Sequence, residues 1–273
     1  MPAEAVLSLL AAVRDATVYD LEQPRYAGAP TFPAHRPGFL YFLHRRHERG
    51  LGEARTSASG LIVMAEHSGT HIDALCHQAE NMQMFGGRAV DARVQSTTGF
   101  TELGAETMAP ILGRGVLIDV ARHRGVDRIP PGELIGADEL ADAAEAHGVS
   151  VSPGDVVLLR TGNGARWSDP DDYLQGAGIA PSASEWLAQR DVLAVGADNM
   201  AWDPIGPVGA DGATLPGHAV LIVRRGIYII ENLLLEQLAA DRRQEFLFVC
   251  LPLKMVGVTG SPVRPLAIVP ISG

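Results

Sequence analysis

The chain carries, at residues 67–77, the stretch His67-Ser68-Gly69-Thr70-His71-Ile72-Asp73-Ala74-Leu75-Cys76-His77. Three imidazoles and one carboxylate stand within these eleven residues. Neutral imidazole and carboxylate are ligands that suit zinc, manganese and iron, and burying them together is costly unless a cation compensates for the lost hydration. The stretch therefore predicts a metal site.

The spacing of these side chains constrains the local backbone. On a straight strand His67 and His71 would stand roughly 13 Å apart, because extended chain advances ~3.3 Å per residue, whereas metal–ligand bonds are only ~2.1 Å long. A bend is required: either Gly69 adopts backbone angles closed to other residues, or the segment turns helically. His71 and Asp73 converge if that part is extended, and Asp73 and His77 converge if a helix begins there.

Further ligands are expected from a distant part of the chain. His218 precedes the apolar run Val220–Val223, and a second apolar run, Ile227–Ile230, ends at Glu231. The linking segment Arg224-Arg225-Gly226 predicts a β-hairpin with glycine at the turn. Antiparallel pairing would place the two outer ends of that hairpin side by side, so His218 and Glu231 are candidate ligands of the same site.

Short β-branched runs recur along the chain, and several are apolar throughout, as expected for strands with both faces covered. Helical patterns lie between them, and Ser182 and Glu185 have the spacing of a capping box. Besides the two hairpin strands, the predicted strands are Leu61–Met64, Val116–Val120, Val156–Arg160, Val192–Val195, Phe246–Leu251 and Leu266–Val269, and the predicted helices are Ala137–His147, Ser182–Gln189 and Leu233–Asp241.

The organisation of the chain is continuous. No repeat or polar linker interrupts the pattern, which predicts one mixed α/β domain over residues 1–273. Proline and glycine concentrate in Pro24–Gly38 and Pro204–Gly217, which we interpret as long surface loops.

The composition limits the class of partner. Of the 273 residues 47% are hydrophobic and 20% are charged, which is ordinary for a soluble globular protein. The formal net charge of −10 argues against nucleic acid, because a phosphate backbone requires clustered Lys and Arg. A small-molecule substrate is favoured.

The sequence predicts a cytoplasmic protein with no membrane segment. No apolar run approaches the ~20 residues that a membrane span requires. Met1–Ala16 lacks both a basic leader and a cleavage site, so we interpret it as an added amphipathic surface helix. Cys76 and Cys250 are expected to be free thiols in a reducing compartment.

A family resemblance is carried by the string His67-x-Gly69-Thr70-His71-x-Asp73-x3-His77, which resembles the signature of the metal-dependent cyclase-like hydrolases. That superfamily contains bacterial kynurenine formamidase and isatin hydrolase. One departure is visible, because the formamidase branch has proline where this chain has Leu75. Further motifs that resemble the family are Tyr19-Asp20-Leu21, Val195-Gly196-Ala197-Asp198 followed by Asp203-Pro204, and Gly260-Ser261-Pro262-Val263-Arg264-Pro265.

The resemblance implies a fold, an assembly and a set of metal ligands. The implied fold is a single compact α/β domain of the swivelling β/β/α type, with a central mixed β-barrel-like sheet flanked by helices. The implied assembly is a homodimer or homotetramer. His67, His71 and Asp73 would bind one divalent ion, Zn²⁺ or Mn²⁺, and Asp73 would bridge to a second ion held by His218 and Glu231.

The reaction implied by these groups is hydrolysis of a small amide by metal-activated water. His77 would act as the general acid/base, taking a proton from the water and returning it to the leaving nitrogen. An arylformamide, a cyclic amide such as isatin, or a lactam would suit this chemistry. Phe39 and Trp202 are candidate substrate-binding aromatics, although core packing accounts for each of them equally well.

Two other functional classes stay open. His71-x-Asp73 with the distant His218 also spells the two-histidine, one-carboxylate triad of a non-haem iron oxygenase. That interpretation leaves Glu231 and the other two histidines of the signature without a role. A non-catalytic metal-binding module is the third class.

Overall fold

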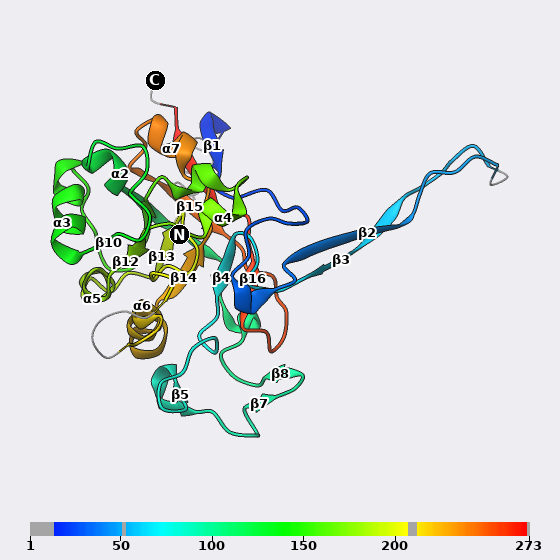
Figure 1. The fold of residues 1–273 in the computed structure, drawn as a ribbon, viewed down its shortest axis with the longest axis horizontal. Coiled ribbons are helices and arrows are strands. Elements are labelled where there is room, and N and C mark those ends of the chain that lie inside the picture. The colour runs from blue at the N-terminus through cyan, green and yellow to red at the C-terminus, as the bar shows by residue number, and fades with distance from the viewer. Residues whose placement is uncertain (1–13, 51–52, 207–211, 272–273) are drawn as a thin grey trace, which may run out of the picture.

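A nine-stranded sheet curls through the centre of the structure, a computed structural model that describes residues 14–50, 53–206 and 212–271 (Figure 1). The strand order is β1-β17-β15-β9-β11-β13-β14-β4-β16, and the neighbours from β9 to β14 are parallel while the other pairs are antiparallel. The predicted α/β class with a barrel-like sheet is therefore confirmed. In chain order the strands are β1 (Ala16–Asp20), β4 (His71–Asp73), β9 (Ile111–Asp119), β11 (Val156–Arg160), β13 (Ala194–Ala197), β14 (Tyr228–Glu231), β15 (Glu245–Cys250), β16 (Gly260–Pro262) and β17 (Leu266–Pro270).

The parallel strands are apolar throughout because each of their faces packs on a separate core. In β11, Val157 and Leu159 belong to the core that also holds the helices, whereas Val156 and Leu158 point into the core on the other face. All four side chains are fully buried. The prediction that these runs are strands covered on both faces is confirmed.

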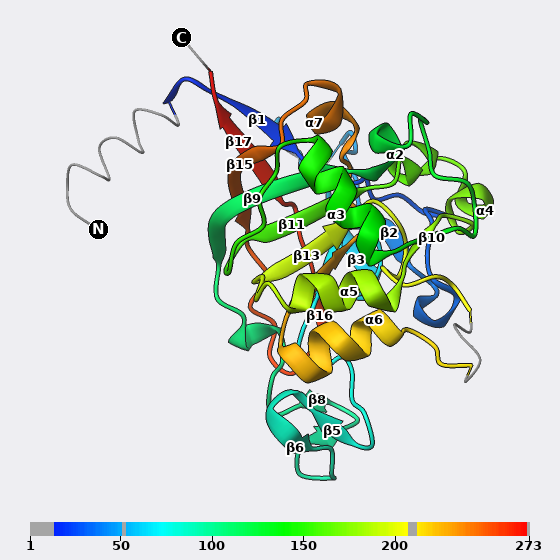
Figure 2. The same cartoon turned by 90° about the vertical axis from the view of Figure 1, so that its left-hand side faces the viewer.

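Helices cover one face of the sheet (Figure 2). The longest are α3 (Ala137–Ala146), α5 (Pro181–Ala188) and α6 (Pro216–His218), which continues without a break into the π-helical segment η5 (Ala219–Arg225). Shorter helical elements are α2 (Val120–His123), α4 (Pro170–Tyr173), α7 (Glu236–Ala240), η1 (Pro33–His35), η2 (Phe85–Gly87), η3 (Ala105–Thr107) and η4 (Asn163–Arg166).

The predicted hairpin of Val220–Val223 with Ile227–Ile230 is wrong. The first run lies in the continuous helix of α6 and η5, which begins with Pro216 at its first turn, where proline is tolerated. The second run is β14, and β14 pairs in parallel with β13, a connection that requires a crossover rather than a tight turn. The apolar run is therefore the buried face of that crossover helix, a case that a short apolar run cannot distinguish from a strand.

Several predicted boundaries also move. Helix α5 begins at Pro181 after Ala180, so Ser182 does not cap it; the Ser182 hydroxyl instead accepts the Ala137 N–H at the start of α3. The predicted strand at 192–195 is β13 at 194–197, and the predicted helix at 233–241 shortens to α7. Most of the predicted N-terminal helix, Met1–Ala16, lies outside the described residues; its last residue, Ala16, is not helical and instead opens β1.

Four small sheets lie outside the main one. The largest pairs β2 (Phe39–Arg45) with β3 (Ser59–Met64) in an antiparallel ribbon that projects from the body (Figure 1). We call residues 39–64 the arm. The other pairs are β5 (Gln83–Met84) with β6 (Arg88–Ala89), β7 (Gln95–Ser96) with β8 (Gly99–Phe100), and β10 (Leu134–Ile135) with β12 (Gly178–Ile179).

The arm corrects one part of the strand prediction. Leu61–Met64 is a strand as predicted, but it does not lie in a buried sheet, because Leu61 and Ile62 are 55% and 56% exposed.

Of the helices in the described ranges, none combines the length and the apolar character needed to cross a membrane.

Candidate metal centre

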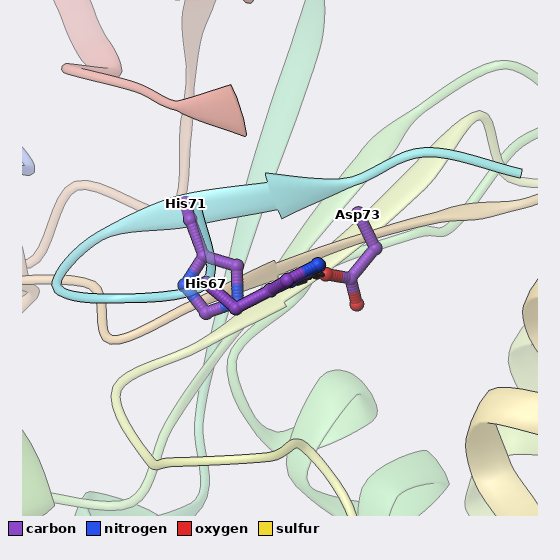
Figure 3. Close-up of side chains that lie close together, drawn as sticks. All are labelled: His67, His71 and Asp73. Carbon is purple, nitrogen blue, oxygen red and sulfur yellow. Dashed lines mark ion pairs between the residues drawn. The ribbon is translucent and has the colours of Figure 1, made fainter. Parts of the chain in front are cut away.

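Strand β4 provides two of the predicted ligands. His71 and Asp73 stand two residues apart on this extended segment, so their side chains point to the same side of the strand (Figure 3). Both are almost fully buried. The register between β4 and β14 places Glu231 directly opposite His71, so a third predicted ligand comes from the neighbouring strand.

A turn brings His67 to the same point. Gly69 has a left-handed backbone, with φ of +64°, and a Cβ atom there would lie 2.5 Å from Nη1 of Arg25. The Arg25 guanidinium donates to the carbonyls of Ser68 and Thr70 and holds the turn in place. Of the two bends that the spacing allows, the structure uses the glycine.

His77 reaches the cluster through a turn and not through a helix. Its N–H donates to the Ala74 carbonyl at 2.9 Å, whereas the Cys76 N–H is taken by Leu103 of a distant loop, so helical hydrogen bonding does not propagate. The His77 ring stacks on His67, with the ring centroids 4.0 Å apart. Asp73 and His77 therefore converge as expected, by a different local structure.

The end of α6 supplies His218. Its Nε2 lies 3.5 Å from Oδ2 of Asp73 and 3.3 Å from Oε1 of Glu231. His71 Nε2 lies 3.6 Å from a carboxylate oxygen of each of the same two residues. The structure thus brings His218 and Glu231 together as predicted from the sequence, although a helix and a strand do so instead of a hairpin.

Each of three imidazoles has one ring nitrogen held by the protein and the other turned toward the carboxylates. Such outer contacts fix the tautomer and the orientation of histidines that bind metals. They are His67 Nε2 with Thr259 Oγ1, His71 Nδ1 with the Gly69 carbonyl, and His218 Nδ1 with Asp203 Oδ2, each at 2.8 Å.

The inner atoms of the cluster lack hydrogen-bond partners. Among the described residues, neither oxygen of Asp73 accepts a hydrogen bond, and Nδ1 of His67 makes none, although all three atoms are buried. An unsatisfied buried carboxylate costs several kcal/mol unless a cation lies against it. Oxygen and nitrogen donors within 4.8 Å of one another, with unused lone pairs, therefore fit a divalent metal ion.

The charge distribution of the cluster separates His77 from His218. Burial, opposed only in part by Asp73, lowers the pKa of His77 well below its usual value, so this ring is neutral near pH 7. Burial would also lower the pKa of His218, but the carboxylates of Asp203, Asp73 and Glu231 outweigh it and raise that pKa well above the usual value. A neutral His77 can accept a proton.

A small cavity of about 30 Å³ lies at the centre of these side chains. The six candidate residues line it together with Phe32, His35, Ala201 and Leu215. Its size suits an ion with a water molecule, so only the reacting group of a substrate could enter it and the rest of the molecule would lie outside. The ligand candidates are buried, whereas His77 and three of the other lining residues, Phe32, His35 and Leu215, keep some exposure, so this side faces solvent.

The two aromatic candidates do not line this cavity. Trp202 is fully buried in the core beneath the helices, and its Nε1 donates to Oγ of Ser184 at 3.0 Å. Phe39 opens the arm, where it pairs with Met64. Core packing accounts for Trp202, and the aromatic side chain at the cavity is Phe32.

Three residues at the centre of the site were not among the candidates predicted from the sequence. His35 lies above the site, with its ring centroid 4.8 Å from that of His67. Asp203 orients His218, and Thr259 orients His67. Asp203 lies in one of the motifs that resemble the family, and His35 lies in the loop Pro24–Gly38, of a kind that is often functional. Only the tertiary structure shows that both lie close to the metal-site residues.

The oxygenase interpretation is not favoured by this geometry. A facial triad needs two histidines and one carboxylate. Here a third imidazole, from His67, and a second carboxylate, from Glu231, converge on the same point. The additional donors match the larger ligand set that the family resemblance implied.

Comparison with known proteins agrees with that resemblance. The family model named Cyclase, described as "Putative cyclase", matches residues 19–204. Kynurenine formamidase of Bordetella petrii is 29% identical over 250 residues, which cover 90% of this chain and 95% of that protein.

Solved structures show the same fold. A crystal structure described as a novel cyclase matches with a TM-score of 0.84 and 28% identity, covering 98% of this chain and 91% of the other. Isatin hydrolase A from Ralstonia solanacearum matches with a TM-score of 0.72 and 25% identity, covering 98% of each chain. Because the family model spans more than half of the sequence and includes the whole signature, the chain belongs to the cyclase family.

Proposed function

We propose that this protein is a metal-dependent hydrolase that cleaves the carbon–nitrogen bond of a small amide. The observation that carries the proposal is the buried Asp73 carboxylate: no described residue donates a hydrogen bond to it, although three imidazoles turn a ring nitrogen toward it. The names of two similar proteins, kynurenine formamidase and isatin hydrolase, describe the cleavage of a formamide and of a cyclic amide, and they support this chemistry.

The ligands of the first ion would be His67, His71 and Asp73, whose donor atoms lie within 4.8 Å of one another. His218 and Glu231, beside the second oxygen of Asp73, would complete this site or hold a second ion. A mixed nitrogen and oxygen donor set suits both Zn²⁺ and Mn²⁺. When bound, the metal would lower the pKa of water toward ~7 and polarise the substrate carbonyl.

His77 would move the proton. Its ring is neutral, keeps some exposure and stacks against a ligand of the metal, so it can reach both water and substrate. It would accept a proton from the attacking water as the oxygen bonds to the carbonyl carbon, and donate that proton to the nitrogen as the carbon–nitrogen bond breaks. A linear amide would give a carboxylic acid and an amine, and a cyclic amide would give one ring-opened molecule that carries both groups; no covalent bond to the protein forms.

The substrate would enter from the side of His77. Phe32, His35 and Leu215 surround the cavity there and are partly exposed. Apolar and imidazole groups beside a polar centre suit a small molecule with one amide and an aromatic or hydrocarbon body. Arylformamides, isatin and γ-lactams have this composition.

The test uses metal-free protein to which Zn²⁺ or Mn²⁺ is returned. Arylformamides, isatin and γ-lactams are offered without oxygen, and the product is measured: formate and the arylamine from an arylformamide, or the ring-opened amino acid from isatin or a lactam. We expect turnover of at least one class that depends on added metal. Turnover that persists in chelated protein, or activity that requires iron and oxygen, would contradict the proposal.

We also propose a cytoplasmic location. Cys76 and Cys250 are both buried and free, as is typical of proteins from reducing compartments. Cell fractionation tests this assignment directly, and recovery of the protein from an oxidising compartment would overturn it.

A further inference from the structure

We propose that Glu66, acting through the Thr259 hydroxyl, selects the tautomer of His67 that can bind a metal ion. Glu66 is a positioning residue, because it acts on the site through another side chain. The inference rests on the proposed metal site and adds to it a residue outside the ligand set. Its basis is a chain of hydrogen bonds that runs from Glu66 to the His67 ring.

The direction of the hydrogen bonds in this chain is fixed by Thr259. A hydroxyl has one proton, and that of Thr259 donates to Oε1 of Glu66. Toward His67 the Thr259 oxygen, which lies 2.8 Å from Nε2, can therefore only accept. Nε2 must then carry the ring proton, and Nδ1 of the neutral ring keeps a free lone pair.

The alternative tautomer would block the site. Nδ1 of His67 lies 2.9 Å from Oδ1 of Asp73, the usual distance of a hydrogen bond (Figure 3). A proton on Nδ1 would donate to this carboxylate, and two candidate ligands would then satisfy each other. Metal binding would have to displace that proton, because a metal ion binds the lone pair of a neutral imidazole. The competition between the two tautomers is therefore decided by the group at Nε2.

Backbone contacts hold the two ends of the chain together. The Ser68 N–H donates to the Ala65 carbonyl at 3.1 Å, so Glu66 and His67 are the two central residues of a turn. On the other side, the Thr259 N–H donates to Oε1 of Glu66 at 3.0 Å. This is the same oxygen that accepts the Thr259 hydroxyl. Two donors of one residue thus bind one carboxylate oxygen, which fixes the hydroxyl proton on the side away from the ring.

The His67 ring has little room to turn away from Thr259. A Cβ atom at Gly260, the next residue, would lie 2.7 Å from Cε1 of the ring, so the ring lies directly against the backbone of β16. The ring also stacks on His77. The Thr259 carbonyl accepts the Ala74 N–H at 2.9 Å, which ties Thr259 to the residue after β4. With the ring confined, the hydrogen bonds decide the position of its proton.

The other two ligand histidines, His71 and His218, need no such chain. Their outer partners, the Gly69 carbonyl and the Asp203 carboxylate, can only accept a hydrogen bond, so each defines the tautomer by itself. At His67 the outer partner is a hydroxyl, which can donate or accept. The tautomer is therefore defined only when a further acceptor takes the hydroxyl proton. The carboxylate at the end of the chain takes it.

Two substitutions break the chain in different ways. Thr259→Val keeps the size of the side chain and removes the acceptor at Nε2. Glu66→Gln keeps the shape, but its amide can donate to the Thr259 hydroxyl, which can then donate to Nε2 and leave the ring proton on Nδ1. Thr259→Ser retains the hydroxyl and is the conservative variant. The matched control is Glu106→Gln, because Glu106 accepts the Gly257 N–H at 2.9 Å and so holds the same segment without being part of the chain.

The first experiment determines the tautomer of His67 in metal-free protein at pH 8, by nitrogen NMR of protein with labelled histidine. The His67 signal is identified by its loss in His67→Asn, and circular dichroism checks that each variant is folded. We expect the proton on Nε2 in the wild type, Thr259→Ser and Glu106→Gln. We expect the Nδ1–H tautomer to become populated in Thr259→Val and Glu66→Gln. A wild-type ring with a proton on Nδ1, or two chain variants with an unchanged tautomer, would overturn the proposal.

The second experiment measures the dissociation constant of Zn²⁺ by competition with a chelator of known affinity. Loss of an outer contact to a metal-binding histidine weakens metal binding by about 10–100-fold, and we expect this loss in Thr259→Val and Glu66→Gln. Thr259→Ser and Glu106→Gln should keep the wild-type affinity. Wild-type protein that takes up no metal would overturn both this inference and the proposed function. Metal binding that is equally tight in the wild type and in both chain variants would overturn this inference alone.

Discussion

Nδ1 of His67 lies 2.9 Å from Oδ1 of Asp73, yet neither atom makes a hydrogen bond within the described part of the chain. The other nitrogen of His67 contacts Thr259, whose hydroxyl in turn donates to Glu66. The ring is therefore held from outside, with its free nitrogen beside a buried and unpartnered oxygen. This arrangement is unfavourable by itself, and a bound cation would compensate for it, with His67 and Asp73 among the residues that would hold the ion.

Asp73→Asn is expected to abolish metal binding without lowering the stability of the metal-free protein. In the wild type, a metal that binds only the folded state adds ~2.7 kcal/mol of stability at a hundredfold excess over its dissociation constant. We expect the melting temperature of the wild type to rise when Mn²⁺ or Zn²⁺ is added and that of the variant to stay constant. Differential scanning fluorimetry with and without chelator measures both.

The matched control for this prediction is Asp155→Asn. Asp155 is also buried, but it pairs with Arg114 and caps the Ser152 N–H. Its loss should lower the melting temperature while the metal-dependent rise persists. If Asp73→Asn kept the full rise, the assignment of Asp73 as a ligand would be wrong.

His77→Asn should separate proton transfer from metal binding. His77 also lies within 4.8 Å of Asp73 and His218 donor atoms, so geometry alone permits it as a ligand. If His77 is the general base, its replacement should lower kcat by about 10²–10⁴-fold, while the metal content stays at the wild-type value. Elemental analysis beside kinetics checks both quantities, with the remote His147→Asn as control; loss of the metal would make His77 a ligand instead.

His35→Ala is expected to change substrate affinity more than turnover. His35 stands over His67 at the exposed side of the cavity and makes no contact with the carboxylates of the cluster within ion-pair distance among the described residues. Loss of one contact of ~1.4 kcal/mol with the substrate raises KM roughly tenfold. Steady-state kinetics with the active amide tests this, and His123→Ala should leave KM unchanged. A tenfold fall in kcat with an unchanged KM would instead mean that His35 acts in the chemical step.

The local sequence was sufficient to predict the central strands and the core of the signature. The runs in β9 and β11 are long, apolar and β-branched, and a strand buried on both faces is the arrangement that this pattern indicates. The period of two in an extended segment placed His71 beside Asp73. The spacing required a bend between His67 and His71 and allowed either a turn at Gly69 or a helical turn; the structure shows that the turn at Gly69 is used.

Other features of the fold and of the site could not be predicted from the local sequence, because they depend on tertiary contacts. Val220–Val223 has the composition of a strand, and it is a helix because the parallel neighbour of β14 requires a crossover. The arm has the alternation of an ordinary strand pair, and nothing in that alternation says whether the pair lies inside the body. Asp203 and Thr259 are single polar residues whose role appears only when His218 and His67 are placed beside them.

Asp198 joins the end of β13 to the segment after β11 through hydrogen bonds. Its Oδ1 accepts from the N–H and hydroxyl of Thr161 at 2.8 and 2.7 Å, and its Oδ2 accepts from the Gly162 N–H at 2.9 Å. Complete burial nevertheless raises the pKa of Asp198 from 3.8 to about 6. The folded state therefore binds a proton more tightly than the unfolded state does.

The sign of the pH effect follows from linkage. The stabilising contribution is complete below the unfolded pKa of 3.8 and is lost as the pH rises through the folded pKa of about 6. The loss amounts to about 3 kcal/mol at ~1.36 kcal/mol per pKa unit. Because other carboxylates titrate in the same range, the quantity to measure is the difference in unfolding free energy between the wild type and Asp198→Asn, by urea denaturation from pH 4 to pH 7.5. As the pH rises, the unfolding free energy of the wild type should fall relative to that of Asp198→Asn, and the difference should level off above pH 6.5. A difference that does not change with pH would mean that the hydrogen bonds from Thr161 and Gly162 offset the burial of the charge.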